Sequence, residues 1–287
     1  SPQSSVSQNS NIAFPHNYKV ISPYIPEKLD FCGESVPLEN IDVRERIERE
    51  FIVQTYYHSA SVLYLKRINR WFPIIEKILA EKGVPDDLKY LALAESGLDN
   101  VVSPAGATGF WQFMRETGKN YGLVIDNEVD ERYNMEKSTY AACDYLLEAK
   151  QQFGTWTLAA ASYNKGLNGI ENQLGRQKAT SYFNLVLNEE TSRYLPRIIA
   201  LKYVMEHPSY YGFDIKEDQL YTPYSTYKVK LDTAVAHFAD YAKLHGLNYK
   251  TLKLFNPWLR DNYLSNKSKK RYFITIPKDG TYYIIPD

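Results

Sequence analysis

The chain has 287 residues, 44% of them hydrophobic and 24% charged, which is sufficient for one large or two smaller packed domains. Its 34 basic and 34 acidic residues give a formal net charge of zero, which argues against nucleic acid as the main partner. No apolar run approaches the ~18 residues of a membrane span. The two cysteines, Cys32 and Cys143, have no metal-site spacing and form no disulfide framework, which leaves two free thiols or one incidental bridge.

The first third of the chain changes from polar to helical. Residues 1–15 are rich in Ser, Asn and Gln and predict a tail or linker, and residues 16–41, with three prolines, predict an extended wrapping segment. Helical spacing then predicts one or two helices over residues 43–70 and another over residues 72–81, ended by Gly83. The expected core residues of the first stretch are Phe51, Ile52, Tyr56, Val62, Leu63, Leu65 and Ile68.

The next helix carries the most informative residue of the chain, Glu95. Pro85 is suited to open this helix and Gly97 to end it. Later helices are predicted over the following ranges, the first with Ser138 or Thr139 as its N-cap: 138–152, 156–163 and 190–207. Residues 42–207 are therefore expected to be nearly all helix.

The composition changes after Pro208. An alternating stretch at residues 221–230 predicts a strand, and residues 271–277 predict a second strand that closes the module. Between them, helices are expected over residues 234–245 and 249–254. The fold class is therefore mainly α, with a small β-α-α-β module. The expected division is a tail and wrapping segment over 1–41, a helical domain over 42–212, and the module over 213–287.

Glu95 is a candidate general acid. It closes an apolar helical run, so apolar neighbours and the negative end of the helix dipole should both raise its pKa. A carboxyl group that stays protonated near neutral pH can donate a proton. The loop at residues 103–114 adds small residues, aromatic rings and an amide, a combination that suggests sugar chemistry. The alternative is a solvated glutamate at a frayed helix end.

Four segments occur together in this chain. They are residues 94–96 (Ala-Glu-Ser), 103–114, 160–166 (Ala-Ala-Ser-Tyr-Asn-Lys-Gly) and 190–194 (Glu-Thr-Ser-Arg-Tyr). In order and spacing they resemble the soluble-type lytic transglycosylases, over roughly residues 40–207. The resemblance implies a lysozyme-like helical catalytic domain of the goose-type class.

The resemblance also implies roles for individual residues. Glu95 matches the catalytic acid and base. The implied substrate-binding residues are Ser103, Gln112, Tyr163, Asn164, Glu190 and Tyr194. The sequence departs from the family's usual pattern at Phe110 and Lys165, beside matched polar groups. These departures bear on the shape of the sugar subsites more than on activity.

The implied activity is cleavage of the β-1,4 bond between N-acetylmuramic acid and N-acetylglucosamine in peptidoglycan, with formation of a 1,6-anhydro product. One carboxylate suffices for this reaction, whereas ordinary glycoside hydrolysis uses two. The alternatives are a lysozyme-type hydrolase on the same fold and a non-catalytic peptidoglycan-binding scaffold. The acid, amide and Tyr-Asn pair together argue against the scaffold.

Several other polar and aromatic residues are interpreted as structural. Asp99 is expected to lie in a solvated loop, and the cluster at residues 130–132 to form ion pairs. Trp111 fits core packing and a sugar platform equally well, and Ser96 is expected to form hydrogen bonds at the helix end. No metal site and no cofactor are expected.

The last module resembles a LysM repeat in degenerate form. Residues 227–230 match its first strand, residues 255–257 (Phe-Asn-Pro) its Leu-Asn-Pro signature, and residues 274–277 its closing strand. LysM modules bind N-acetylglucosamine chains, but the usual Gly after the first strand is Leu231 here. The module is therefore expected to bind sugar weakly or to serve as a structural cap.

The resemblance further implies the setting. The expected partner is the peptidoglycan glycan strand, the expected location is the periplasm or cell envelope, and the expected state is a monomer. Anchoring to the outer membrane is compatible with this setting, with the anchor outside these 287 residues.

Overall fold

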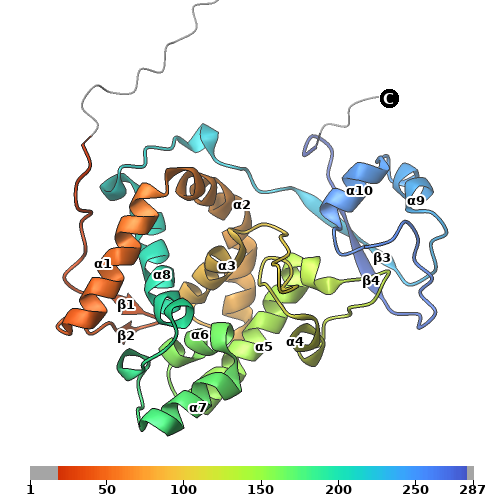
Figure 1. The fold of residues 1–287 in the computed structure, drawn as a ribbon. Helices are drawn as coiled ribbons and strands as arrows, with labels where there is room; N and C mark the ends of the chain where they lie inside the picture. Colours follow the sequence, from red (N-terminus) through yellow and green to blue (C-terminus); the bar gives the residue numbers. More distant parts are fainter. Residues whose placement is uncertain (1–18, 283–287) are drawn as a thin grey trace, which may run out of the picture.

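A computed structural model describes residues 19–282, so the tail expected over residues 1–15 lies outside the described residues. Over the described residues the chain forms ten α-helices and two small two-stranded sheets, which confirms the predicted mainly α class (Figure 1). The helices are α1 Ile41–Tyr56, α2 His58–Lys82, α3 Lys89–Ser96, α4 Arg115–Asn120, α5 Met135–Phe153, α6 Trp156–Lys165, α7 Leu167–Gln177, α8 Glu189–Glu206, α9 Phe238–Leu244 and α10 Tyr249–Phe255. The strands are β1 Asp30–Phe31, β2 Glu34–Ser35, β3 Thr226–Leu231 and β4 Tyr272–Pro277. Short 3₁₀ turns lie at Asp86–Leu88, Glu131–Tyr133, Tyr182–Asn184, Pro208–Tyr211 and Glu217–Gln219.

The separate helix expected over residues 72–81 is wrong, because α2 continues through Pro73 to Lys82. An interior proline removes one backbone hydrogen bond and costs about 3 kcal/mol. Burial of Phe72, Ile75 and Leu79 on both sides of the proline offsets that cost. Gly83 ends the helix in the left-handed conformation, as predicted.

The predicted N-cap of α5 is also wrong. The helix begins at Met135, and the side chain of Asn134 caps it by accepting a hydrogen bond from the Lys137 N–H at 3.1 Å. Ser138 and Thr139 are fully buried one turn later. Two helices, α4 and α7, were not expected. Glycines inside both, such as Gly169 and Gly175 in α7, lower the helix propensity that sequence analysis relies on.

Helix α8 lies at the centre of the larger hydrophobic core. It packs against α1, α3 and α6, while α5 packs against α2 and α6. Between α1 and α8, the buried carboxylate of Glu50 accepts a hydrogen bond from Arg193 Nε at 2.7 Å. The N-terminal segment adds Leu29 and Phe31 to this core next to the β1–β2 hairpin. The acidic end of α3 is therefore held between α8 and α2 in the middle of the domain.

The chain between α8 and the last module runs across α2 (Figure 1). The expected strand over residues 221–230 begins only at Thr226, because the preceding residues bond to α2 instead. Asn69 Nδ2 donates to the Tyr221 carbonyl at 3.1 Å, and Arg70 Nε donates to the Thr222 carbonyl at 2.9 Å. Polar side chains of α2 thus bond to the backbone carbonyls that a neighbouring strand would otherwise bond to.

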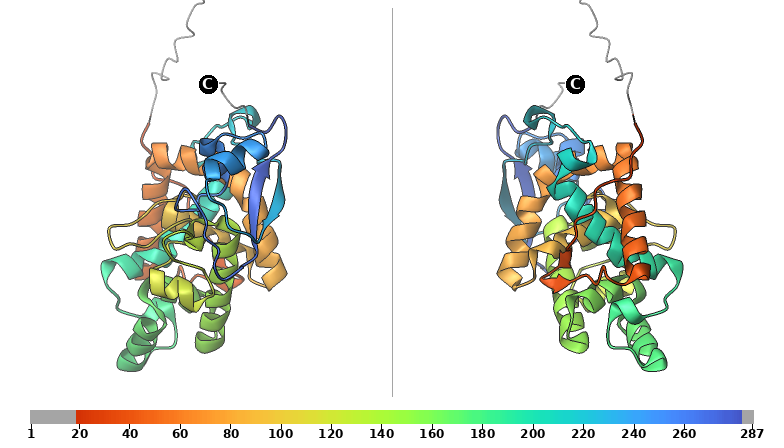
Figure 2. Two further views of the ribbon diagram at one scale, coloured as in Figure 1. Left: turned by 90° about the vertical axis from the view of Figure 1, so that its right-hand side faces the viewer. Right: turned by 90° about the vertical axis from the view of Figure 1, so that its left-hand side faces the viewer.

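Strands β3 and β4 pair antiparallel, with Val229 opposite Ile274, and α9 and α10 lie against this sheet (Figure 2). A second hydrophobic core, centred on Phe238, Leu252 and Ile274, fills the module. The predicted order of strand, two helices and strand is the order observed, although α9 starts four residues later than expected. The delay arises because Val235 pairs with Leu264 before the helix begins.

The module is joined to the helical domain by the loop between α4 and α5. Val129 of this loop belongs to the second core and pairs with Leu259. The Asp130 N–H donates to the Trp258 carbonyl at 2.9 Å, and Glu128 accepts from both the N–H and the hydroxyl of Ser265 at 2.7 Å. The loop therefore belongs to both parts of the molecule.

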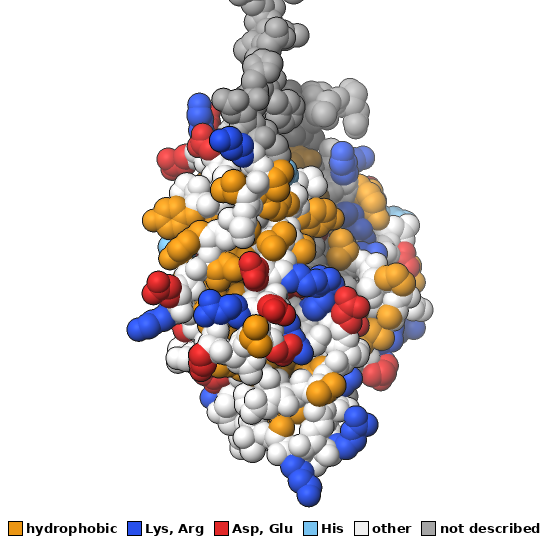
Figure 3. Space-filling model, turned by 60° about the vertical axis from the view of Figure 1, so that its left-hand side comes forward, with side chains coloured by type: hydrophobic (Ala, Val, Ile, Leu, Met, Phe, Trp, Pro, Cys, Tyr) orange, Lys and Arg blue, Asp and Glu red, His pale blue; other side chains and the backbone are white. Residues whose placement is uncertain are grey.

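The surface shows no single-sign charged face in the direction of Figure 3, where acidic and basic side chains are interspersed. This agrees with the formal net charge of zero. Among the described residues, none of the helices combines the length and apolar character that crossing a membrane requires.

Candidate active site

Glu95 lies in the last turn of α3. Leu91, Ala92 and Leu93 of this helix are fully buried, so packing fixes its position. Gly97 follows in the left-handed conformation (φ 62°), and its N–H bonds to the Leu93 carbonyl at 2.9 Å. A Cβ atom at Gly97 would lie 2.6 Å from the Tyr64 ring, so only glycine fits there. The helix ends where the sequence predicted.

Glu95 is partly buried as a residue, and the pKa of its enclosed carboxyl group is raised to about 7. Burial is the main cause, and the charge of Glu190 adds to it. The hydrogen bond from Tyr194 and the charge of Arg197 act in the opposite direction. The pKa of Glu95 is therefore raised, as the sequence predicted, and burial is the principal cause. Sequence analysis did not single out Arg197, which lies one turn after Tyr194 on α8.

Helix α8 brings two candidate residues to the acid. The hydroxyl of Tyr194, itself 3% exposed, donates a hydrogen bond to Glu95 Oε1 at 2.5 Å. Glu190, one turn earlier, is exposed and accepts from Asn164 Nδ2 at 3.1 Å. Asn164 Oδ1 in turn accepts from the Thr191 hydroxyl at 2.9 Å. Two hydrogen-bonded sets thus lie near the acid, Tyr194 with Glu95 and Asn164 with Glu190 and Thr191.

Tyr163 of α6 fixes the loop at residues 103–114. Its hydroxyl donates to the Trp111 carbonyl at 2.8 Å. Its ring packs edge-on against Trp111, Phe113 and Tyr145. Burial raises the pKa of Tyr163 well above its usual value, and the charge of Glu95 adds to this effect. Tyr163 therefore lies within electrostatic reach of the acid.

The same loop carries Gln112 in the left-handed conformation (φ 51°). Its Nε2 donates to the carbonyls of Gly109 at 2.8 Å and Val101 at 3.0 Å. Over the residues described, no hydrogen bond is formed to its Oε1, which is free to accept one from a ligand. The Ser103 hydroxyl accepts from the Ala107 N–H at 3.0 Å, within a turn. No hydrogen bond in the described part of the chain joins Ser103 to Glu95 or Tyr194.

The position of Trp111 decides between core packing and a sugar platform. It is fully buried, and its Nε1 donates to the Thr139 hydroxyl at 2.8 Å. It is therefore a core residue and offers no platform for a sugar. Ser96 lies with its Oγ 2.8 Å from the Phe110 carbonyl, so it joins the end of α3 to the loop.

The acidic residues interpreted above as structural form ion pairs with arginines. Asp99 pairs with Arg67 at 2.7 Å, and its side chain is 53% exposed. Asp130 and Arg132 form a buried ion pair at 2.7 Å. Arg132 Nη1 also donates to the carbonyls of Gly106 at 3.1 Å and Phe113 at 3.2 Å, so this pair supports the loop. Cys32 and Cys143 are free thiols.

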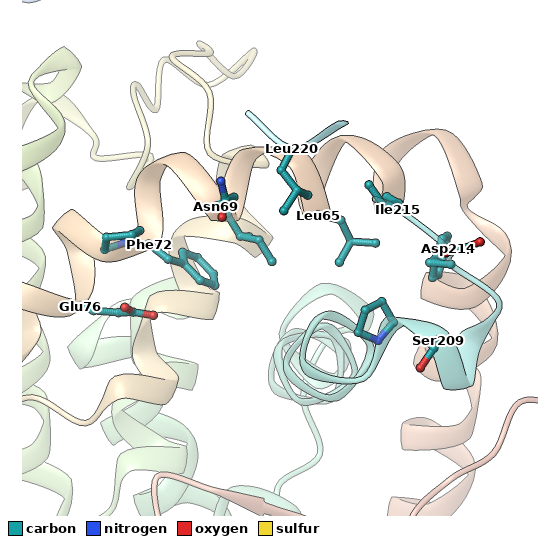
Figure 4. A pocket seen from close by; sticks show the side chains of 12 residues that line it. Leu65, Asn69, Phe72, Glu76, Ser209, Asp214, Ile215 and Leu220 are labelled. Atoms are coloured by element: carbon teal, nitrogen blue, oxygen red, sulfur yellow. The ribbon is translucent and has the colours of Figure 1, made fainter. Parts of the chain in front are cut away.

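One sizeable cavity lies away from these groups. Its volume is about 520 Å³, and it lies between α2 and the segment that follows α8 (Figure 4). Apolar side chains such as Leu65, Phe72 and Ile215 line it, and none of the candidate site residues does. Its two acidic residues are Glu76, which pairs with Lys89, and Asp214.

Comparisons with known proteins match both the helical domain and the last module to described families. Residues 72–186 match the family described as the transglycosylase SLT domain, and residues 227–280 match the soluble lytic transglycosylase C-terminal LysM-like domain. Two curated relatives are named membrane-bound lytic murein transglycosylase D, from Escherichia coli strain K12 and from Escherichia coli O6:H1 strain CFT073. Each is 26% identical over 257 residues, a match that covers 86% of this chain and 55% of the relative. The chain thus spans about half the length of the curated relatives it matches.

A solved structure, the 70 kDa soluble lytic transglycosylase from Escherichia coli, is similar with a TM-score of 0.42 and 20% identity. That match covers 53% of this chain and 26% of the other, and a similarity this slight carries no argument. The two family matches confirm the resemblance that the motifs indicated. The chain therefore contains a transglycosylase SLT domain followed by a LysM-like C-terminal domain, and it is similar in sequence to membrane-bound lytic murein transglycosylase D.

Proposed function

We propose that this chain is a lytic transglycosylase that cleaves the β-1,4 bond between N-acetylmuramic acid and N-acetylglucosamine in peptidoglycan. The observation that carries the proposal is the state of Glu95. Glu95 is partly buried as a residue, and its carboxyl group has a pKa of about 7 and accepts a hydrogen bond from Tyr194. Near neutral pH such a group populates both protonation states, so it can act first as an acid and then as a base.

The reaction needs no second carboxylate. Glu95 gives its proton to the glycosidic oxygen, and the bond between that oxygen and C1 of the muramic acid breaks. The N-acetyl carbonyl of the same sugar can stabilise the charge at C1, as in substrate-assisted glycosidases. The ionised Glu95 then takes the proton of the C6 hydroxyl, and O6 bonds to C1. Glu95 regains its proton and no water is consumed, because the attack is intramolecular.

The surrounding residues fit supporting roles. Tyr194 orients the carboxyl group and stabilises its ionised form. Gln112 offers its free Oε1 to a substrate N–H or hydroxyl, and Tyr163 holds the loop that carries Gln112. Asn164 of α6 and Glu190 of α8 add a hydrogen-bonded polar pair, and the charge of Glu190 reaches Glu95. For Ser103 we propose a contact with the N-acetyl group, because its hydroxyl hydrogen is not needed in the turn.

Mass spectrometry of muropeptides released from isolated sacculi tests the proposal. We expect 1,6-anhydro-muramic ends, which are one water lighter than reducing ends. Reducing ends as the main product would assign hydrolysis instead and make the exposed Glu190, within electrostatic reach of Glu95, the second carboxylate to examine. If a folded preparation releases no muropeptides, the peptidoglycan-binding scaffold remains as the function.

We also propose that the protein acts in the cell envelope, on glycan strands and as a monomer, with any membrane anchor outside these residues. The support for the location and the glycan partner is the match to relatives whose name describes a membrane-bound murein enzyme. Light scattering on the purified chain tests the monomer, and a dimer mass would contradict it.

A further inference from the structure

A second cavity, of about 460 Å³, lies at the junction of the helical domain and the LysM-like module. Its walls come from α2, the residues after α3, the start of α5, the segment before β3, and α10 with β4. Its volume falls within the range of ~300–1,000 Å³ typical of ligand sites. None of the residues assigned a catalytic or binding role above lines it.

A continuous row of aromatic rings crosses this cavity. Phe110 packs edge-on against Trp71 at 5.2 Å, Trp71 against Tyr224 at 6.0 Å, and Tyr224 against Phe255 at 4.9 Å. Phe110 is buried, whereas the other three rings are partly exposed. The row therefore starts in the helical domain, crosses the connecting segment and ends in the module. The Arg70 guanidinium, also in the lining, covers one face of the Tyr224 ring at 4.1 Å from its centroid.

Polar groups accompany the rings. The side-chain oxygen of Asn100, which belongs to the lining, is buried and has no hydrogen-bond partner over the residues described. Asn100 Nδ2 donates to the Tyr133 carbonyl at 3.3 Å, so Asn100 is part of the packed wall. The neighbouring carboxylate of Asp99, also in the lining, is 53% exposed and can accept a hydrogen bond from a ligand hydroxyl. The charges in the lining are largely paired, with Arg67 on Asp99 at 2.7 Å and Glu136 on Lys228. Paired charges favour a neutral ligand over a strongly anionic one.

The cavity also adjoins the catalytic acid. Leu98, Asp99 and Asn100 in its wall follow directly after Gly97, which ends the helix of Glu95. Arg67 in the lining donates to the Gly97 carbonyl at 3.0 Å, and Ser96 bonds to the carbonyl of Phe110. A ligand in the cavity would therefore lie against the far side of the segment that positions Glu95.

From these observations we infer that the junction cavity is a second saccharide-binding site, which takes a neutral N-acetylated amino-sugar unit. A pyranose presents flat faces of C–H groups, which pack on aromatic rings, and a rim of hydroxyl groups, which need hydrogen-bond partners. Trp71 and Tyr224 supply the rings, and the exposed carboxylate of Asp99 supplies an acceptor. The choice of amino sugar rests on the proposed function, because the same glycan strand would fill both sites.

The test measures binding in the Glu95→Gln protein, so that no probe is cleaved. Oligomers of N-acetylglucosamine, a dimer and a hexamer, are titrated by calorimetry into this protein. We expect the hexamer to bind more tightly than the dimer. Adding Tyr224→Ala should weaken hexamer binding about fivefold to tenfold, equivalent to about 1–1.4 kcal/mol. The matched control, Tyr227→Ala, removes a 44% exposed tyrosine of β3 outside the cavity and should leave hexamer binding unchanged.

A second substitution, Phe255→Leu, approaches the cavity from the module and guards against a folding defect in the first. Circular dichroism shows which of the variants remain folded. Hexamer binding as tight in both folded variants as in the Glu95→Gln parent would overturn the inference. Muropeptide release by the wild-type chain is measured separately. If the wild type releases muropeptides but Tyr224→Ala leaves hexamer binding unchanged, only the cavity proposal is refuted. If Tyr224→Ala weakens hexamer binding but the wild type releases no muropeptides, only the proposed reaction is refuted.

Discussion

At the scale of single residues, Glu95 decides the chemistry. The Glu95→Gln substitution keeps the side-chain shape but cannot give or take the proton. We expect it to lower muropeptide release by at least ~10²–10⁴-fold, the usual contribution of general acid–base catalysis. Release from sacculi measured against wild type checks this, with the circular dichroism spectrum as the control for folding. Near wild-type release would contradict the assignment of Glu95.

The raised pKa of Glu95 also predicts an effect on stability. The pKa of Glu95 is about 7 in the folded chain against its ordinary value of 4.5, so the folded state binds the proton more tightly. Wild-type stability should therefore fall as pH rises from about 4.5 to about 7, and the loss should persist above that range. Glu95→Gln lacks this loss. Urea unfolding should show the variant more stable than wild type by on the order of 1–3 kcal/mol at pH 8. At pH 4 the difference should largely disappear, and an equal difference at both pH values would show that the carboxyl titration is not its cause.

Tyr194 is expected to act through Glu95. Its hydrogen bond favours the ionised carboxylate, so Tyr194→Phe should raise the pKa of Glu95 further. The alkaline limb of the pH–rate profile should then move to higher pH, while the maximum rate falls because the carboxyl group is less well oriented. A rate loss without any shift of the alkaline limb would show that Tyr194 serves packing alone.

At the scale of elements, the loop at residues 103–114 depends on Arg132 from the next loop. Gly109 (φ 83°) packs so closely that an added Cβ would lie 2.0 Å from the Arg132 carbonyl oxygen. Gly106 also has a positive φ (86°), but a Cβ there meets nothing within 4 Å. Substituting each glycine therefore distinguishes two effects. At Gly106 an added side chain strains only the backbone, whereas at Gly109 it also clashes with Arg132.

We expect Gly106→Ala to cost about 1 kcal/mol of unfolding free energy, from the left-handed backbone alone. Gly109→Ala should cost several times more and reduce muropeptide release, because the loop that carries Gln112 must move away from Arg132. Chemical denaturation of both variants measures the difference. Equal losses in the two variants would contradict close packing between the loop and Arg132.

At the scale of the whole molecule, the LysM-like module packs against the helical domain and helps to hold one of its loops. Val129 is packed in the second core, and Asp130 bonds both to the Trp258 carbonyl and to Arg132. This loop thus connects the module to the segment that carries the candidate site, in addition to the ion pair between Lys228 and Glu136.

The sequence predicts that residues 42–207 fold and cleave without the module, and the structure adds an expected cost. A chain ending at residue 213 keeps the larger core, so we expect it to remain folded by circular dichroism. It should melt at a lower temperature and cleave more slowly, because Val129 becomes exposed and Asp130 loses its partner at Trp258. An insoluble or unfolded product would show that the two parts cannot be separated at this boundary.

Local patterns in the sequence were sufficient for much of the molecule. The helical class, the helix that ends in Glu95, Gly97 as its stop signal and the four-element order of the module all follow from neighbouring residues. These features depend on spacing, capping and backbone conformation within a few positions, which a sequence states directly. The motifs that indicated the family likewise lie in short segments.

The tertiary structure alone decided how those segments meet. Tyr194 reaches Glu95 across 99 positions of sequence, Trp111 turns into the core, and Pro73 is tolerated inside α2. Each outcome depends on burial against distant residues, a free-energy term that no local pattern contains. The elevated pKa of Glu95 likewise has burial as its main cause. The sequence by itself thus determined which residues are available to the site, whereas packing decided which of them face the acid and which support it.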